Sequence, residues 1–320
     1  MYGAIIGDIV GSRWEFNPTN DYNFELLSKE NGFTDDTICT IGIADALVHN
    51  KDFGKTIHEW CNKYPNPMGG YGGRFAQWVH SDNPQPYNSF GNGSAMRVSP
   101  VAFWYEDESE MLDAAAATAL PSHNHDEGIK GAQTVALAIY KAMQYNYHSY
   151  QEAPNHIDEI LEECVQFSGY DINMPKSSVL NQFDETCQGT VPVALKIISM
   201  STSYVDAVRL AVSLGADADT LGAIVGSIAE AIWGTPYWLR DDINEYLPED
   251  MQMVLWDFHH ARPWSDKMLI DTTFDKIDMS EGAWDLLENN ERESLQQVVM
   301  QQKEQKRKLM LERAKARNQW

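Results

Sequence analysis

The segment 215–234 most constrains what this chain can fold into, because an acidic beginning leads into a nearly unbroken run of small and apolar residues. Ile224 and Ile228 belong to a run whose apolar side chains would face several directions on a helix, so burial on most sides is expected. Gly222 and Gly226 leave room for a second helix to approach closely. The pattern therefore predicts a helix at the centre of the fold.

Three oxygen-bearing side chains stand where this helix begins, namely Asp217, Asp219 and Thr220. Two carboxylates at the edge of an apolar core are costly unless they are paired. Carboxylate and hydroxyl oxygens are suitable ligands for Mg²⁺, Mn²⁺ or Ca²⁺. An aspartate that only caps the helix N-terminus is the alternative, and this motif alone is compatible with both.

Length and charge limit the class of protein. The 320 residues are enough for one large domain or two small ones. Acidic residues exceed basic residues by 47 to 24, which gives a net charge of −23. A nucleic-acid polymer is therefore not an expected partner, since its phosphates would meet a repulsive field. A local pocket for a small phosphate-containing ligand stays compatible with this charge.

Cysteine content and hydropathy indicate where the protein works. The four cysteines form no CxxC pair, which argues against a zinc cluster or a disulfide framework and favours a reducing compartment. The first residues lack a basic stretch and reach Asp8 too early for a signal peptide. No run of about 18 apolar residues is present, so no membrane span is expected. The sequence predicts a soluble, cytoplasmic protein.

Apolar periodicity predicts an all-α fold in one compact domain over 1–264. A loop is expected over 12–32, and a set of functional loops over the Gly-rich and Pro-rich segment 64–100. The segment 265–320 is expected to be a C-terminal extension, ending in a charged, solvated helix. Helices are expected over 1–12, 37–49, 108–120, 128–146, 155–168, 190–200, 203–214 and 219–233.

A second acidic cluster, Thr34, Asp35 and Asp36, also precedes an apolar helix. Together the two clusters can supply four carboxylates and two hydroxyls to one centre. So many negative charges would require cations in a dry pocket, and the ligands are numerous enough for two of them. Two unrelated helix caps are the alternative, but both clusters carry the unusual doubled acid.

The motifs resemble those of the ADP-ribosylglycohydrolases, including the dinitrogenase reductase-activating glycohydrolase and the ADP-ribosylarginine and ADP-ribosylserine hydrolases. The resemblance extends over about residues 3–234. It rests on five stretches of the sequence, which are Gly3–Phe16, Thr34–Thr37, Gly70–Gly72, Gly91–Arg97 and Gly215–Thr220, together with His123. Ala216 stands where the family usually has a second glycine.

The resemblance implies a compact, orthogonal helical domain with a central dinuclear site for Mg²⁺ or Mn²⁺. The implied metal ligands are Thr34, Asp35, Asp36, Asp217, Asp219 and Thr220, with Asp219 as the bridging carboxylate. Glu15, on a mobile loop after the first helix, is implied to be catalytic, together with Asp35 and Asp219. From its spacing alone, Glu15 would be interpreted as a surface acid on a loop, and the resemblance is what assigns it to the site.

The family's ligand loops and central histidine map onto a further set of residues. Tyr71 and Phe90 could anchor their loops or contact an adenine or ribose ring. Backbone N–H groups of the Gly91–Gly93 turn could cradle a diphosphate. His125 has no assigned role, and the pairs 241–242 and 259–260 are interpreted as surface or structural. The implied substrate-binding residues are Gly70, Tyr71, Gly72, Phe90, Gly91, Asn92, Gly93, Ser94, Met96 and His123.

The expected activity is hydrolysis of the bond between ADP-ribose and an acceptor on a protein or small molecule. Arginine-, serine- and small-molecule-linked ADP-ribose all fit the motifs, and no sequence feature assigns an oligomeric state. Two alternatives come from other classes. One is a non-catalytic ADP-ribose-binding or structural relative, and the other is a dinuclear-metal phosphohydrolase that acts on nucleotides.

Overall fold

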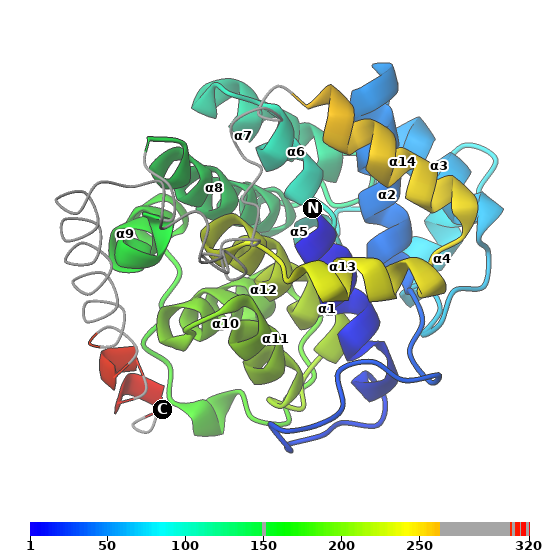
Figure 1. Cartoon of the computed structure of the whole chain (residues 1–320). Coiled ribbons are helices and arrows are strands. Elements are labelled where there is room, and N and C mark those ends of the chain that lie inside the picture. The colour runs from blue at the N-terminus through cyan, green and yellow to red at the C-terminus, as the bar shows by residue number, and fades with distance from the viewer. Residues whose placement is uncertain (149–151, 263–307, 309–310, 314, 318–319) are drawn as a thin grey trace, which may run out of the picture.

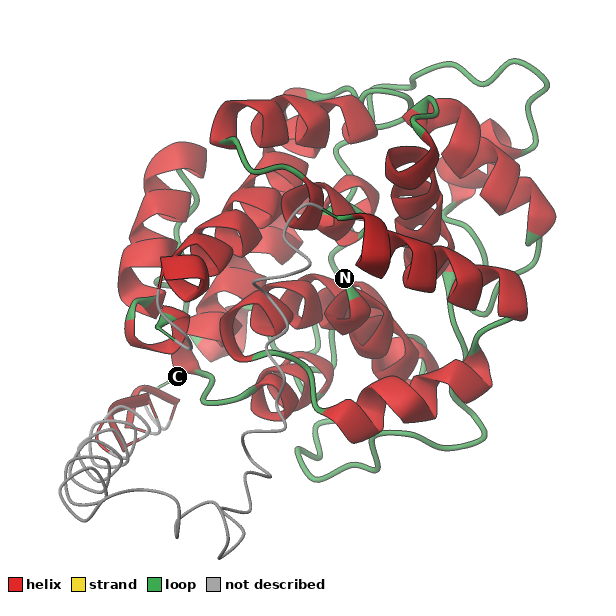
Figure 2. Cartoon of the chain, turned by 45° about the horizontal axis from the view of Figure 1, so that its top comes forward, coloured by secondary structure: helices red, strands yellow, loops and turns green. Residues whose placement is uncertain are grey.

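The computed structural model describes residues 1–148, 152–262, 308, 311–313, 315–317 and 320. Within this part of the chain the regular structure is helical, and the one β-type pairing is an isolated antiparallel bridge between Gly91 and Thr186 (Figure 2). The predicted all-α class is confirmed. The α-helices are α1 (Tyr2–Gly11), α2 (Asp35–His49), α3 (Phe53–Lys63), α4 (Gly73–Val79), α5 (Gly93–Met96), α6 (Ser99–Trp104), α7 (Glu108–Ala119), α8 (Asp126–His148), α9 (Ile157–Ser168), α10 (Cys187–Met200), α11 (Tyr204–Val212), α12 (Ala218–Trp233), α13 (Tyr237–Ile243) and α14 (Glu249–Ala261), with 3₁₀ turns η1 (Ser12–Trp14), η2 (Ala153–Asn155), η3 (Lys176–Ser178) and η4 (Asn244–Tyr246).

The centre of the fold is a close antiparallel pair of helices, α1 and α12 (Figure 1). A Cβ atom added at any of the glycines of this contact would collide with the backbone of the facing helix. The two backbones can therefore approach this closely only because side chains are absent between them. We call this contact the glycine seam; it consists of Gly3 facing Gly226, Gly7 facing Gly222, and Gly11 facing Ala218.

The other helices surround this pair and cover it. Every residue of α12 from Ala218 to Ile232 is buried, as the nearly unbroken apolar sequence predicted. Helices α8, α10 and α11 pack against α12, while α2 packs against α1 and is itself covered by α3, α6 and α14. Among the described helices, none is both long enough and apolar enough to cross a membrane.

The predicted helices are present, but the sequence interpretation missed several others. The segment 64–100 is not only a loop set, because it contains α4, α5 and the start of α6. Helices α3, α13 and α14 were also not predicted. Helix α2 begins at Asp35 rather than Thr37, since the Thr34 side chain caps it by accepting a hydrogen bond from the Asp36 N–H.

The predicted C-terminal extension lies largely outside the described residues. Among its described residues, which are mostly helical, Arg313, Arg317 and Trp320 contact the body of the protein, and the expected solvated helix stays a prediction. Arg313 is buried and donates hydrogen bonds to the carbonyls of Ile198 and Ser199 at the end of α10. Arg317 pairs with Asp206 at 3.0 Å. Polar contacts of this kind leave no apolar periodicity in the sequence, so they could not be predicted from it.

Candidate metal centre and its surroundings

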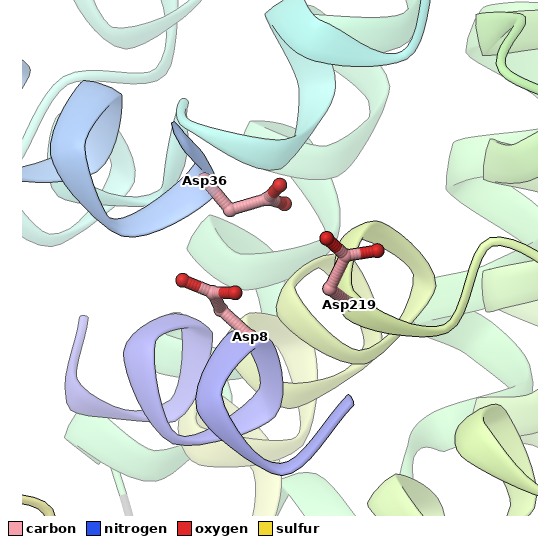
Figure 3. A group of neighbouring side chains, drawn as sticks. All are labelled: Asp8, Asp36 and Asp219. Atoms are coloured by element: carbon pink, nitrogen blue, oxygen red, sulfur yellow. The ribbon is translucent and has the colours of Figure 1, made fainter. Parts of the chain in front are cut away.

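Three aspartates converge from three helices at the middle of the molecule, and their carboxylates point toward one another (Figure 3). Asp36 is in the first turn of α2, and Asp219 is in the first turn of α12. Asp8 directly follows Gly7, so the glycine seam carries it to the start of α12. The N-terminal ends of α2 and α12 carry partial positive charge, which favours acidic side chains there.

The carboxylates form two overlapping groups. In the first, oxygens of Asp8, Asp36 and Asp219 lie within 4.8 Å of one another. In the second, oxygens of Glu15, Asp217 and Asp219 lie within the same distance. Asp219 is the member common to both groups. This is the position that the sequence analysis gave to a bridging carboxylate, although the ligand role itself stays a prediction.

Asp8 is the residue of this centre that the sequence analysis missed. Its Oδ1 accepts a hydrogen bond from the Thr34 hydroxyl at 2.8 Å. Its Oδ2 accepts from the Thr34 N–H at 3.1 Å, and from the N–H and hydroxyl of Thr37 at 3.1 and 2.5 Å. Asp8 of α1 thus satisfies backbone donors at the beginning of α2. The sequence signal was a single acid within an apolar helix, with no local partner.

Burial sets the electrostatics of the cluster. It raises the pKa of Asp8 to about 6 and that of Asp217 to about 7. Burial, reinforced by the neighbouring carboxylates, also raises the pKa values of Asp36 and Asp219 well above their usual range. Both effects disfavour the charged form of a carboxyl group. The cluster therefore needs either protons or cations at neutral pH.

The residues present fit a hard divalent cation. Asp36 Oδ1, Asp219 Oδ1 and Glu15 Oε2 are buried and have no hydrogen-bond partner within the described chain. A buried carboxylate oxygen without a partner is unfavourable. All the converging donors are oxygens, which is the ligand type that Mg²⁺ and Mn²⁺ prefer. A zinc-type set of sulfur and imidazole ligands is not present in either group.

The remaining predicted ligands lie at or beside the cluster. The Thr220 hydroxyl is 3.2 Å from Asp36 Oδ2, and the Thr34 hydroxyl is 3.3 Å from the same atom. Asp35 is half-buried and belongs to neither carboxylate group. Burial first, and then the charges of neighbouring acids that include Asp219 and Asp8, raise the pKa of Asp35, so it nevertheless experiences the field of the cluster.

Glu15 follows the turn η1 and reaches the centre from a loop. It is half-buried, and burial followed by the charge of Asp219 raises its pKa to about 8. A Cβ atom added at Gly69 would collide with Glu15 Oε2, so the loop before α4 passes directly over this carboxylate. Gly69 has a φ of 76°, a left-handed conformation that favours glycine. The surface-acid interpretation of Glu15 does not fit this position.

Three of the predicted substrate-binding side chains make contacts within the protein. The Asn92 amide donates to Asp217 Oδ2 at 2.7 Å, and the Ser94 hydroxyl donates to the Gly128 carbonyl at 2.6 Å. Met96 is buried, with its sulfur 3.9 Å from the Thr220 hydroxyl. Direct contact between these side chains and a ligand stays a prediction.

The Gly91–Gly93 turn differs from the predicted diphosphate cradle. The Gly91 N–H donates to Ser89 Oγ at 3.1 Å, and the Asn92 N–H donates to the Glu185 carbonyl at 2.7 Å. Two of the N–H groups expected to be exposed therefore already have partners. The contribution of the segment that contains Glu185 could not be predicted from the sequence, because this segment pairs with the turn from far along the chain.

The loop that contains Gly70, Tyr71 and Gly72 is partly exposed. A Cβ atom added at Gly70 or Gly72 would meet no atom within 4 Å. The Tyr71 hydroxyl donates to the Tyr64 carbonyl at 2.7 Å, which identifies Tyr71 as an anchor of its loop. Phe90 is 43% exposed and packs edge-on against His125, so its ring is available to a ligand.

The histidines divide into one buried residue and several structural or surface ones. His123 is buried, and its Nε2 lies against Gly93. His125 accepts a hydrogen bond from the Glu127 N–H at the start of α8. His260, Asp241 and Asp242 are exposed, and His259 is half-buried, in agreement with the surface or structural role expected for them.

Comparison with known proteins identifies what the chain resembles. Residues 1–266 match the family model described as ADP-ribosylglycohydrolase. ADP-ribosylhydrolase ARH3 of Mus musculus is 24% identical over 332 residues, covering 82% of this chain and 87% of that protein. ADP-ribosylarginine hydrolase Tri1 of Pseudomonas putida is 23% identical, covering 81% and 74%. A solved structure titled "ADP-ribosylglycohydrolase-related protein complex" has a TM-score of 0.59 at 22% identity, covering 81% of this chain and 95% of that one.

Proposed function

Because this chain belongs to the ADP-ribosylglycohydrolase family, and is thus a hydrolase of glycosyl bonds with ADP-ribosyl substrates, we propose that its activity depends on two bound divalent cations. The proposed reaction releases ADP-ribose from an acceptor on a protein or a small molecule. The single observation that carries the proposal is the pair of carboxylate groups that share Asp219, with unpartnered buried oxygens in both.

The residues that would hold Mg²⁺ or Mn²⁺ are those predicted from the sequence, with Asp8 nearby. Asp36, Thr34 and Thr220 would serve one side, Asp217 the other, and Asp219 both, while Asp35 would complete the set from the rim. Bound divalent cations would supply Lewis-acid stabilisation and anchoring points for sugar hydroxyls. Asp8 accepts four hydrogen bonds, so its proposed role is to orient Thr34 and the start of α2 rather than to provide the main ligand.

Glu15 is the proposed proton-transferring residue. Cleavage of a glycosidic bond develops oxocarbenium character on the ribose, and a carboxyl group that gives or takes a proton assists it. In the metal-free site, burial and then the charge of Asp219 raise the pKa of Glu15 to about 8, which favours its protonated form there. Its Oε2 has no hydrogen-bond partner, and the Gly69 loop passes against it. Since Glu15 also lies within reach of Asp217 and Asp219, a ligand role is the competing assignment.

The proposed partners are ADP-ribosylated proteins or small molecules, without a nucleic-acid polymer. The net charge of −23 supports this choice, because it opposes binding of a polyanion. The cytoplasmic location expected from the cysteine content is part of the same proposal. Arginine-, serine- and small-molecule linkages are all candidates for the bond that is cut.

The proposal is tested with a panel of defined ADP-ribosylated substrates, assayed with Mg²⁺, with Mn²⁺ and with a chelator. The expected result is release of free ADP-ribose from at least one linkage, lost with the chelator and restored by the cation. AMP or inorganic phosphate as the product would instead identify a nucleotide phosphohydrolase. Binding of ADP-ribose without turnover on any linkage would identify a non-catalytic relative.

A further inference from the structure

A buried chain of hydrogen bonds connects Arg97 to His123 through Ser122. Arg97 Nη2 donates to Ser122 Oγ at 2.9 Å and to the Thr118 carbonyl at 2.9 Å. Ser122 Oγ lies 2.8 Å from His123 Nδ1. All three side chains are at most 4% exposed. Arg97 and Ser122 both lie outside the two carboxylate groups.

The donors and acceptors in this series of hydrogen bonds fix its direction, which runs from Arg97 to His123. A guanidinium has only donors, so Ser122 Oγ must accept from Arg97. The Ser122 O–H then has one acceptor among its contacts in the described chain, which is His123 Nδ1. A neutral imidazole whose Nδ1 accepts a hydrogen bond carries its proton on Nε2.

We infer that Arg97 and Ser122 are positioning residues that fix the His123 proton on Nε2, so that this nitrogen donates a hydrogen bond to an oxygen of the ligand held at the Gly91–Gly93 turn. The inference rests on the proposed function for the identity of that ligand, whose ribose hydroxyls and diphosphate offer acceptor oxygens.

The edge of the His123 ring that carries Nε2 faces the Gly91–Gly93 turn. A Cβ atom added at Gly93 would lie 3.0 Å from Nε2, and one added at Gly91 would lie 3.5 Å from it. Nε2 makes no hydrogen bond within the described residues, whereas Nδ1 is held by Ser122. The ring is therefore fixed on one side and has an unused donor on the other. The backbone N–H groups of Gly91 and Asn92 already have partners, so Nε2 is a donor at this turn that a ligand oxygen can use.

Burial and the charge of Arg97 together keep the ring neutral. Burial, and then the Arg97 guanidinium, lower the pKa of His123 well below its usual value. Arg97 itself is 1% exposed, and its Nε and Nη1 atoms have no hydrogen-bond partner in the described chain. A buried cation without a carboxylate partner is unusual, and orienting Ser122 gives it a specific effect.

The tautomer is measured directly by two-dimensional ¹H–¹⁵N NMR of the imidazole nitrogens in the ligand-free protein. The His123→Gln variant assigns the His123 signals among the nine histidines. We expect a protonated Nε2 and an unprotonated Nδ1 in the wild type, and a mixture of tautomers in Ser122→Ala. A protonated Nδ1 in the wild type, or an unchanged tautomer in Ser122→Ala, would overturn the inference.

Binding of free ADP-ribose by calorimetry tests the contact with the ligand. Ser122→Ala should weaken binding about 3- to 10-fold, the range for one neutral hydrogen bond. That loss should disappear when Ser122→Ala is made in the His123→Gln background, since no tautomer remains to be fixed. Ser99→Ala is the matched control, because Ser99 is 0% exposed and its hydroxyl has no partner.

The two possible failures are distinguishable. A wild-type protein that shows the expected tautomer but neither binds nor releases ADP-ribose would contradict the proposed function, and with it the identity of the ligand. A wild type that binds ADP-ribose, with Ser122→Ala binding equally well, would overturn the positioning role alone.

Discussion

The side-chain amide of Asn92 donates a 2.7 Å hydrogen bond to the carboxylate of Asp217. The same amide nitrogen lies 3.1 Å from the Thr190 hydroxyl. Asn92 precedes α5, and Asp217 precedes α12, so this bond joins the turn of the ligand loop to one end of the carboxylate cluster. The two parts of the site are therefore not positioned independently.

Replacing Asn92 should weaken metal binding. In Asn92→Leu the Asp217 carboxylate loses its orienting donor, and partners of this kind change metal affinity about 10- to 100-fold. Titration of the chelator-treated protein with Mn²⁺ by calorimetry measures the change. Thr190→Val removes the other contact of the same amide and should have the smaller effect. Equal Mn²⁺ affinity in Asn92→Leu and wild type would show that the bond does not support a metal ligand.

Asp219→Ala should abolish cation binding and turnover, because Asp219 is shared by both carboxylate groups. Asp36→Ala should be nearly as severe. In each variant we expect turnover to fall at least about 100-fold, a larger loss than substitution of a residue that only orients a metal ligand would cause. The metal-free fold should be retained or stabilised, since crowding of negative charge is relieved. Metal content, turnover and thermal unfolding are the measurements. Full metal content with full turnover in either variant would rule out the dinuclear arrangement.

Glu15→Gln preserves the size of the side chain and removes its titration. If Glu15 transfers a proton, kcat should fall about 10²–10⁴-fold while ADP-ribose affinity and metal content stay the same. Turnover on an ADP-ribosylated peptide, calorimetry and metal analysis measure the three quantities. Loss of metal would instead assign Glu15 as a ligand, and unchanged turnover would remove it from the mechanism.

The stability of the metal-free protein should depend on pH, and bound metal should remove that dependence. The folded-state pKa values of Asp8 and Asp217, about 6 and about 7, lie above the ordinary value of 3.8. Between about pH 4 and pH 7 the folded protein therefore binds more protons than the unfolded chain. The stabilisation of the fold by these bound protons is complete below about pH 4 and is lost as the pH rises through 6 to 7. In chelator, the unfolding temperature should fall from pH 5 to pH 8. With saturating Mg²⁺ the fall should be absent, because cations replace the protons. The same slope in both conditions would contradict the prediction.

Gly7→Ala should destabilise the protein by about 1–3 kcal/mol or more, because its Cβ would collide with the carbonyl of Gly222 across the glycine seam. Turnover should fall as well, since separation of α1 from α12 moves Asp8 away from Asp219. Urea unfolding measures the first effect. Gly73→Ala is the control, because no atom lies within 4 Å of its added Cβ and it should be neutral. A Gly7→Ala variant as stable as Gly73→Ala would show that the two helices separate without cost.

Much of this centre could be predicted because its signals are local. A doubled acid directly before an apolar helix marks Asp36 and Asp219 in the sequence itself, and apolar periodicity marks the helices around them. Gly222 and Gly226 indicated that some helix approaches α12 closely. They could not indicate that it is α1, because a contact between distant segments leaves no mark in either one alone. The role of Asp8 depends on that contact, and so does its hydrogen bonding to Thr34 and Thr37.

The glycine seam has a consequence for the register of the two central helices. Its glycines recur every four residues, so a slide of α1 along α12 by one repeat, about 6 Å, would still leave two of the three pairs with small residues on both sides. Such a shift would carry Asp8 away from the beginning of α2. The four hydrogen bonds that Asp8 accepts from Thr34 and Thr37 are available in only one of these registers. A polar residue of the metal centre thus selects one helix packing among several that the apolar contacts alone would allow.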